Sequence, residues 1–149
     1  MTNQEIVDRL SSLMKLDIDA VKSYGQAIEE IDISDVRQQV TQFRDDHNRH
    51  ITDLSNMIRE FGGTPPRYSV DMRGFFMEGF TAIRSLTGTA GALKALHTNE
   101  EITNKGYLDA HSLEMSPSVM ELIEKNFADE QRHLSYITQA INNKIWEKR

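Results

Sequence analysis

The sequence contains no cysteine, which excludes disulfide bonds, thiolate catalysis and metal sites with sulfur ligands. It has only three prolines, so long helices are permitted. It also has no apolar run approaching about 18 residues, so no membrane-spanning segment is expected. Basic residues are in the minority, with 17 Lys and Arg against 23 Asp and Glu, for a net charge of −6. Nucleic acid is therefore an unsuitable main partner, because phosphate binding requires a basic face.

The remaining composition suits a helical protein. A chain of 149 residues is expected to form one domain, residues 1–149, with its own hydrophobic core. Abundant charged residues and scarce proline favour an all-α fold. The first residues lack a basic stretch followed by an apolar run, so no secretory signal is expected and the cytoplasm is the predicted location.

Apolar residues recur at alternating spacings of three and four along four long segments, which is the pattern of amphipathic helices. The first helix is predicted at about residues 3–31. Ser34 is the predicted N-cap of the second helix, which should end at the glycines and prolines of residues 62–66. The third follows residues 87–88, and the fourth starts at Ser116 as N-cap, with Pro117 in its first turn.

The link between the second and third helices is long, about 25 residues, whereas the other two links are short. Short links make each pair antiparallel, and a link of this length can cross the bundle so that the second and third helices run parallel. The alternative is a simple up-down bundle with a fifth helix on one side. A short amphipathic helix is expected near residues 70–86, where Phe75, Phe76 and Phe80 either pack against the bundle or form a homodimer interface.

The chain also repeats itself at an offset of 83 residues, and the repeat falls on residue types that bind metals. Each half carries a carboxylate, then a tyrosine seven residues later, and then two candidate ligands spaced i, i+3. Residues three apart share one face of a helix, so each such pair can hold one centre. The matched pairs are Asp17/Glu100, Tyr24/Tyr107, Asp46/Asp129, His47/Glu130, Arg49/Arg132 and His50/His133.

Six ionisable side chains of these pairs occupy positions on the apolar stripes. Charged residues are rarely buried unless they are paired or bind a metal. The first ligand on each helix lies 15 residues from the nearest short turn, or about 22 Å along the axis, so all six should meet near mid-bundle. They are predicted to bind metal, and the alternative is a buried hydrogen-bonded ion network without metal. The six are Asp17, His47, His50, Glu100, Glu130 and His133.

With these residues in these positions, the chain resembles the ferritin-like superfamily, which includes ferritins, bacterioferritins and rubrerythrins. The carboxylate-plus-tyrosine spacing and the Glu-x-x-His pair of Glu130 and His133 carry the resemblance. The glycine–proline stop and the Phe-rich crossover are similar to those of small bacterial members. The resemblance implies a ferritin-like four-helix bundle of two antiparallel helix pairs, with a carboxylate-bridged di-iron site that reacts with O₂ or peroxide.

Two residues depart from the pattern of that superfamily. Asp17 stands where Glu is usual, and His47 replaces a Glu that bridges the two irons in the superfamily. A neutral imidazole cannot bridge, and three carboxylates leave two divalent ions with one positive charge uncompensated. A single metal could be held by Asp17, Glu130, His47 and His50, or two metals could share Glu130 and a solvent bridge.

Other polar residues near these positions are not predicted to be metal ligands. Tyr24 and Tyr107 are expected either to hydrogen-bond a metal ligand or to be ordinary core aromatics. The two repeated arginines are expected on the flank of the bundle, paired with acids. His97 is expected to be solvated or capping, and nothing supports a ligand role for His111.

The predicted function is a metal-binding protein that holds one or two irons per chain, with Mn or Zn as other suitable metals. Its partners would be a small oxidant and, without cysteines for a rubredoxin centre, a separate electron-donor protein. The alternative is a non-enzymatic stress or interaction bundle with a degenerate or structural Zn site, which the substitution at His47 favours. A substrate oxidase is a weaker third hypothesis, since it would need an access channel.

Overall fold

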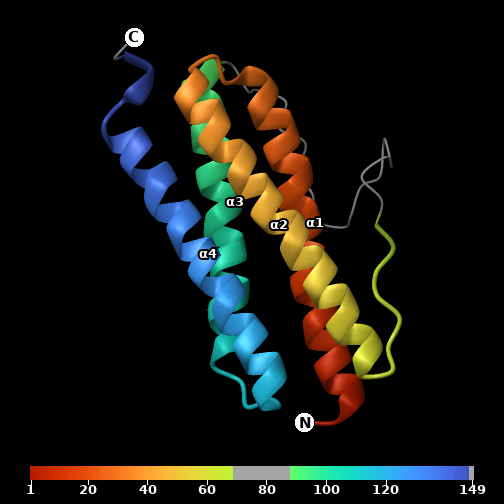
Figure 1. Ribbon diagram of the computed structural model, residues 1–149. Coiled ribbons are helices and arrows are strands. Elements are labelled where there is room, and N and C mark those ends of the chain that lie inside the picture. The colour runs from red at the N-terminus through yellow and green to blue at the C-terminus, as the bar shows by residue number, and fades with distance from the viewer. Residues whose placement is uncertain (69–87, 148–149) are drawn as a thin grey trace.

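The computed structural model describes residues 1–68 and 88–147, and in these ranges the chain is helical with no strand (Figure 1). The all-α prediction is confirmed. No helix in these ranges is long and apolar enough to cross a membrane. The elements are α1 (Asn3–Glu30), α2 (Ser34–Glu60), α3 (Gly88–His111), α4 (Pro117–Asn142) and a final 3₁₀ turn, η1 (Ile145–Glu147).

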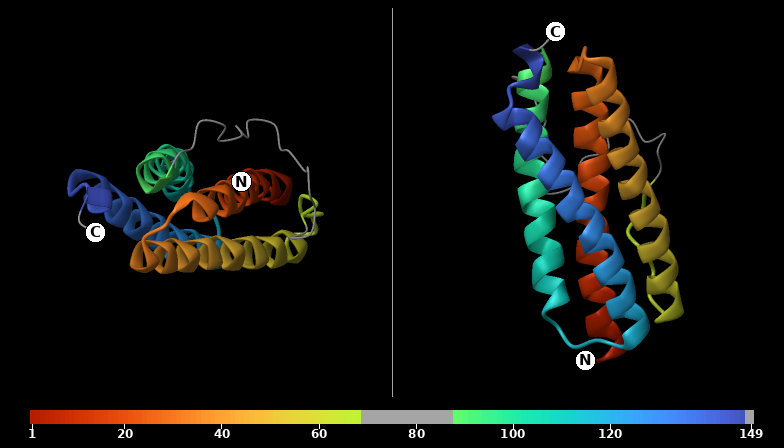
Figure 2. Two further views of the ribbon diagram at one scale, coloured as in Figure 1. Left: turned by 90° about the horizontal axis from the view of Figure 1, so that it is seen from above. Right: turned by 60° about the vertical axis from the view of Figure 1, so that its left-hand side comes forward.

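The four helices form a bundle in which α1 and α4 run in one direction and α2 and α3 in the other (Figures 1 and 2). The helix α2 ends at one end of the bundle and α3 begins at the opposite end, so their connection crosses the bundle length. This confirms the predicted crossover and excludes the simple up-down alternative. The short helix predicted near residues 70–86, with its Phe cluster, lies outside the described residues.

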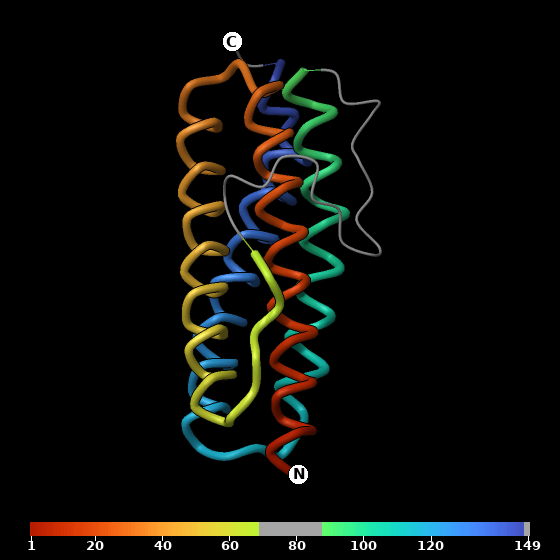
Figure 3. The backbone as a smooth tube through the Cα atoms, turned by 90° about the vertical axis from the view of Figure 1, so that its right-hand side faces the viewer, coloured from red at the N-terminus to blue at the C-terminus, as the bar shows by residue number. Residues whose placement is uncertain are grey.

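The start of that crossover, residues 61–68, runs back alongside α1 and α2 (Figure 3). Tyr68 anchors it, because its hydroxyl donates to Oδ1 of Asn48 at 3.3 Å and its ring packs on the core. The turn itself needs glycine, since Gly62 has a φ of +81°.

Gly63 lies where the end of α2 meets the beginning of α1, and it has no room for a side chain. A Cβ there would lie 2.5 Å from Cγ1 of Val7, whose β-branched side chain is stiff. Gly63→Ala is therefore expected to lower the free energy of unfolding by about 1–3 kcal/mol, measured by urea denaturation. Gly25→Ala is the control, because nothing lies within 4 Å of that Cβ and Ala favours a helix interior. Equal stability of the Gly63→Ala variant and the parent would contradict this packing.

The turn between α1 and α2 differs from the prediction in one detail. Ser34 is the first residue of α2, and Ile33 occupies the N-cap position without a side-chain hydrogen bond. Packing decides this turn, because Ile31 is buried and Ile33 packs on the same apolar cluster. The backbone N–H of Asp32 donates to Thr89 Oγ1 at 3.1 Å, which ties the turn to the first residues of α3. In contrast, Ser116 is the N-cap of α4 as predicted, with a proline in the first turn.

The core consists of two apolar clusters, one toward each end of the bundle. Leu10, Leu54 and Ile123 belong to the cluster near the amino terminus of α1, and Phe43 and Leu96 belong to the other. Buried polar and charged side chains lie between the clusters, at the middle of the helices. The pairs α1–α2, α3–α4 and α1–α3 pack extensively, while α2 and α4 make fewer contacts with each other.

Candidate metal centre

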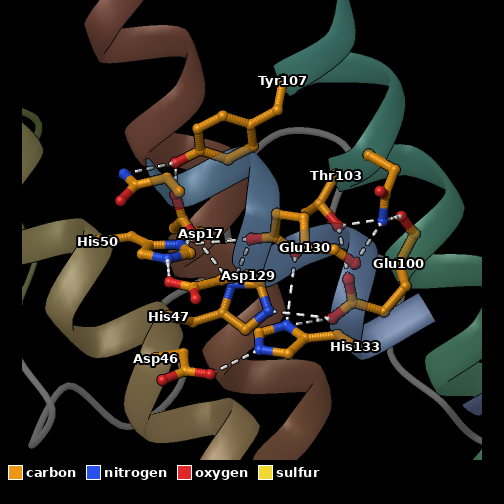
Figure 4. Close-up of polar contacts among 12 residues, drawn as sticks. Asp17, Asp46, His47, His50, Glu100, Thr103, Tyr107, Asp129, Glu130 and His133 are labelled. Atoms are coloured by element: carbon orange, nitrogen blue, oxygen red, sulfur yellow. Dashed lines mark hydrogen bonds and ion pairs between the residues drawn. The ribbon is translucent and has the colours of Figure 1, made fainter. Parts of the chain in front are cut away.

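Six charged or titratable side chains from all four helices converge in the middle of the bundle (Figure 4). Each has 0% of its surface exposed. The apolar periodicity of each helix turns these positions inward, and their equal distance from the turns brings them to one level. The structure thus brings together every residue predicted as a metal ligand. They are Asp17 on α1, His47 and His50 on α2, Glu100 on α3, and Glu130 and His133 on α4.

Four of these residues form a first group that faces α1. Asp17, His47, His50 and Glu130 each offer an atom, and all four atoms lie within 4.8 Å of one another. Nδ1 of His47 and Nδ1 of His50 lie 2.7 and 3.0 Å from Oδ1 of Asp17. The same two nitrogens lie 3.2 and 3.3 Å from Oε1 of Glu130. Two imidazoles and two carboxylates therefore surround one point.

A second group faces α3 and shares two members with the first. It comprises His47, Glu100, Glu130 and His133, again with ligand atoms within 4.8 Å of one another. Nε2 of His47 lies 3.0 Å from Oε1 of Glu100, and Nδ1 of His133 lies 3.3 Å from the same oxygen. Oε2 of Glu130 lies 3.6 Å from Nδ1 of His133, so Glu130 turns one oxygen to each group. The two groups have the same ligand chemistry.

Each of the two tyrosines hydrogen-bonds a carboxylate on another helix, so the tyrosine of α1 reaches α3 and the tyrosine of α3 reaches α1. Tyr24 donates to Oε1 of Glu100, and Tyr107 donates to Oδ2 of Asp17, both at 2.6 Å. Burial, together with the charge of the accepting carboxylate, raises the pKa of both hydroxyls well above their usual value. The hydroxyls therefore stay protonated and fix the orientation of the two carboxylates.

Two aspartates outside the six-residue cluster orient two of its histidines, and sequence reasoning did not identify this role. Nε2 of His50 donates to Asp129 at 2.9 Å, and Nε2 of His133 donates to Asp46 at 2.8 Å. Each histidine thus turns Nδ1 toward the centre. The signal was present as the repeated pattern Asp-x-x-Arg-His at residues 46–50 and 129–133. Asp46 on α2 reaches a histidine of α4, and Asp129 on α4 reaches a histidine of α2.

Two arginines cross-link these aspartates on the flank between α2 and α4. Arg132 donates to Asp46 at 2.7 Å and to Asp129 at 3.2 Å. Arg49 donates to the same two aspartates. The arginine side chains are 41% and 51% exposed, so they lie on the surface as predicted. Two smaller polar side chains complete the surroundings, since Thr103 contacts Glu100 and Asn126 donates to Tyr107.

The three histidines are held in their protonated form when no metal is present. Burial alone lowers the pKa of His47, but the charge of Glu130 and the hydrogen bond to Asp17 outweigh it, and the pKa lies well above its usual value. The charge of Asp17 likewise overcomes burial and raises the pKa of His50 to about 10. For His133, the hydrogen bond to its outer aspartate overcomes burial and raises the pKa to about 9.

The three carboxylates of the cluster differ in how well they are compensated. Burial raises the pKa of Asp17 and Glu100, but the neighbouring histidines reverse this and hold both below the usual range. Glu130 keeps a raised pKa because burial and the charge of Glu100 prevail over its histidine contacts. The carboxyl that both groups share is therefore the one whose charge is least stabilised by the protein.

These residues fit a metal ion on the evidence of three unsatisfied atoms. Among the described residues, no hydrogen bond reaches Oε1 or Oε2 of Glu130 or Nδ1 of His133, although all three atoms are buried. They make only ion-pair contacts of 3.2–3.6 Å with one another and with neighbouring side chains, and a cation between them would bind all three. Neutral imidazoles with carboxylates are the ligands of non-haem Fe, Mn and Zn. The other two histidines lie elsewhere, with His97 beside Glu101 and His111 beside Glu124.

Comparison with known proteins agrees with this architecture. A family described as "Domain of unknown function (DUF2383)" matches residues 5–113, which span α1, α2 and α3. A solved structure described as ferritin like, diiron-carboxylate proteins from Bacillus anthracis str. Ames is 18% identical, with a TM-score of 0.70. The match covers 93% of this chain and 96% of that one. No curated protein matches the sequence. At this identity the likeness establishes the fold, and the ferritin-like expectation for the fold is confirmed.

Proposed function

The chain belongs to the family described as a domain of unknown function (DUF2383), and from the site that its ferritin-like fold builds we propose that it binds non-haem iron and reacts with O₂ or peroxide. One observation carries the proposal: two adjoining groups, each of two histidines and two carboxylates, converge in the buried core. A protein core does not gather so many ionisable groups at random, because each costs free energy unless it is paired or bound to a cation.

Iron is favoured by ligand type and by the structural neighbour. Imidazole and carboxylate ligands suit Fe, Mn and Zn. Metals that prefer thiolate ligands are disfavoured, because the chain has no cysteine. The similar Bacillus anthracis structure is described as a diiron-carboxylate protein. When bound, iron would supply electrons for reduction of the oxidant. We propose a capacity of one or two irons per chain, with Mn and Zn as competitors.

The protein's own residues would position the metal and keep the surroundings dry. Glu130 would connect the two groups through its two oxygens, and the tyrosines would orient the carboxylates opposite them. The six ligand residues are fully buried, and none of them lines the surface hollows that Tyr68, Arg59 and His97 border in the described part of the chain. These observations favour a small oxidant over a bulky organic substrate. Electrons would come from a separate donor protein.

A structural or degenerate site is the second candidate, and one observation favours it. His47 already hydrogen-bonds Asp17 at 2.7 Å and Glu100 at 3.0 Å, so much of the cluster satisfies itself without a metal. A non-enzymatic bundle with tightly held Zn, or with no metal, would use such a network for stability alone. The two candidates differ in redox activity.

Elemental analysis after anaerobic Fe(II) loading, followed by absorbance on exposure to air, tests the proposal. We expect about one to two irons per chain and a new absorbance band in air. Binding at 100 times Kd adds about 2.7 kcal/mol of stability. For a chain of this size each kcal/mol raises Tm by about 2–4 °C, so Tm should rise by roughly 5–11 °C.

The matched variants are His133→Ala and His111→Ala, which remove a buried and a half-exposed histidine respectively. The first should lose iron and the metal-induced rise in Tm together, and the second should keep both. Stoichiometric Zn that iron does not displace, or no iron uptake, would favour the structural alternative. Unchanged iron content in His133→Ala would remove that histidine from the site.

A further inference from the structure

The ring of His47 lies between the two ligand groups and turns one nitrogen toward each. Its Nδ1 lies 2.7 Å from Asp17 and 3.2 Å from Glu130 Oε1, on the side facing α1. Its Nε2 lies 3.0 Å from Glu100, on the side facing α3. The other two histidines of the cluster use only Nδ1 toward the centre, because their Nε2 atoms donate to aspartates on the flank.

We propose that His47 bridges two divalent metal ions as an imidazolate, with Nδ1 bound to one ion and Nε2 to the other. This inference rests on the proposed metal-binding function and adds how the two ions are joined. A neutral imidazole has one free lone pair and can bind only one ion. A ring that has lost both N–H protons has a lone pair on each nitrogen and can bind two. The two protons leave to solvent as the two metal–nitrogen bonds form.

The charges of the site support this bridge. Asp17, Glu100 and Glu130 contribute three negative charges, and two divalent ions contribute four positive charges. With three neutral histidines, one positive charge would remain buried without compensation, which is costly in a core. An imidazolate at His47 supplies the fourth negative charge. The substitution of His for a carboxylate at this position then leaves the metal-bound centre neutral.

The surroundings hold the ring in the bridging position. His47 is fully buried, and its ring centroid lies 5.3 Å from that of Tyr24, 5.0 Å from that of His133 and 5.6 Å from that of His50. Among the described residues, the hydrogen bonds and ion pairs of both nitrogens go to carboxylates of the site. Glu130, its counterpart at the offset of 83 residues, divides its two oxygens between the same two groups. The two groups are thus joined by one carboxylate and one imidazole.

An imidazolate bridge has a measurable consequence for the separation of the ions. Two-metal sites whose ions are joined only through oxygen atoms, from carboxylates or solvent, hold their ions about 3.5–4 Å apart. An imidazolate binds the two ions through nitrogens on opposite edges of its ring. The ring then lies between the ions, so the distance between the metals is longer than about 3.5–4 Å. The distance between the metals therefore distinguishes this bridge from the carboxylate or solvent bridge that the sequence suggested.

Cobalt X-ray absorption on the full chain loaded with Co(II) tests the proposal, with metal content measured on the same samples. The parent protein is expected to hold two Co(II) and to show no cobalt–cobalt scattering at about 3.5–4 Å. His47→Glu is expected to hold two Co(II) and to gain that scattering. Two Co(II) with short scattering in the parent protein would overturn the bridge and leave metal binding intact. One Co(II) at saturation would do the same, and no Co(II) would overturn the proposed function as well.

A second variant tests the two nitrogens without introducing a new charge. His47→Gly is expected to hold at most one Co(II), and added imidazole should restore the second ion. 1-Methylimidazole should not restore it, because one of its nitrogens is blocked. Circular dichroism establishes that each variant is folded. Equal rescue by the two compounds would overturn the bridge.

Discussion

Replacement of Glu130 by Gln is expected to lower the affinity for divalent metal by more than about 100-fold while the metal-free bundle keeps its stability. Loss of a partner outside the ligand shell typically costs 10–100-fold in metal affinity, and Glu130 is a candidate ligand of both groups. An amide supplies no charge to either ion. Burial and the charge of Glu100 raise the pKa of Glu130, so its charge is disfavoured in the metal-free fold, and the metal-free bundle should keep most of its stability.

Titration with Zn(II) or Co(II) against a competing chelator measures the affinity, and urea denaturation in the presence of a chelator measures the stability. Glu121→Gln is the control, because it makes the same chemical change at an exposed position of α4. It should leave metal affinity unchanged. A near-normal affinity in Glu130→Gln would show that Glu130 is not a metal ligand. It would also contradict the inference that the two groups share a carboxylate.

Metal affinity is expected to fall about 100-fold for each unit by which the pH is lowered from 8 to 6, because binding displaces two protons. Without metal, the pKa of His50 is about 10 and that of His133 about 9, and the pKa of His47 is also well raised. All three are therefore protonated across this range. An ion in either group must displace the protons of two histidines, and each proton contributes tenfold per pH unit.

The sign follows from the direction of the shifts. A histidine with a raised pKa stabilises the metal-free fold at low pH, and this contribution is lost as the pH rises through about 9 to 10. Metal binding competes with that protonated state, so affinity rises with pH and levels off once the histidines are neutral. Competition titrations at several pH values give the slope. A slope near one would mean that only one histidine binds each ion, and no slope would contradict histidine ligation.

The helices could be predicted because their signals are local. The alternating spacing of apolar residues indicated the first helix at residues 3–31, and α1 occupies Asn3–Glu30. Proline 117 and the glycines after α2 marked boundaries through their own backbone preferences. Ser34 was the exception, since the burial of Ile31 and the contact of Asp32 with Thr89 decide where α2 starts. Those contacts join segments far apart in the sequence.

The candidate ligands could be predicted as a set, whereas their contacts could not. Counting from the two short turns placed all six at one level, and the structure brings all six together. The roles of Asp46 and Asp129 depend on α2 and α4 being neighbours across the bundle, which residue spacing within one helix does not reveal. The tyrosines show the same limit, because each one reaches a carboxylate on another helix.

The sequence by itself determined which residues turn inward and at what height, because helical periodicity and distance from a turn are properties of one segment. It thereby determined the fold class and the chemical types in the centre. Only the tertiary structure decided which atom of each side chain faces which neighbour, because this depends on the packing of four helices against one another. It placed the two nitrogens of His47 on different carboxylates and left both carboxylate oxygens of Glu130 without a hydrogen bond among the described residues. These two features carry the metal proposal and the proposed bridge.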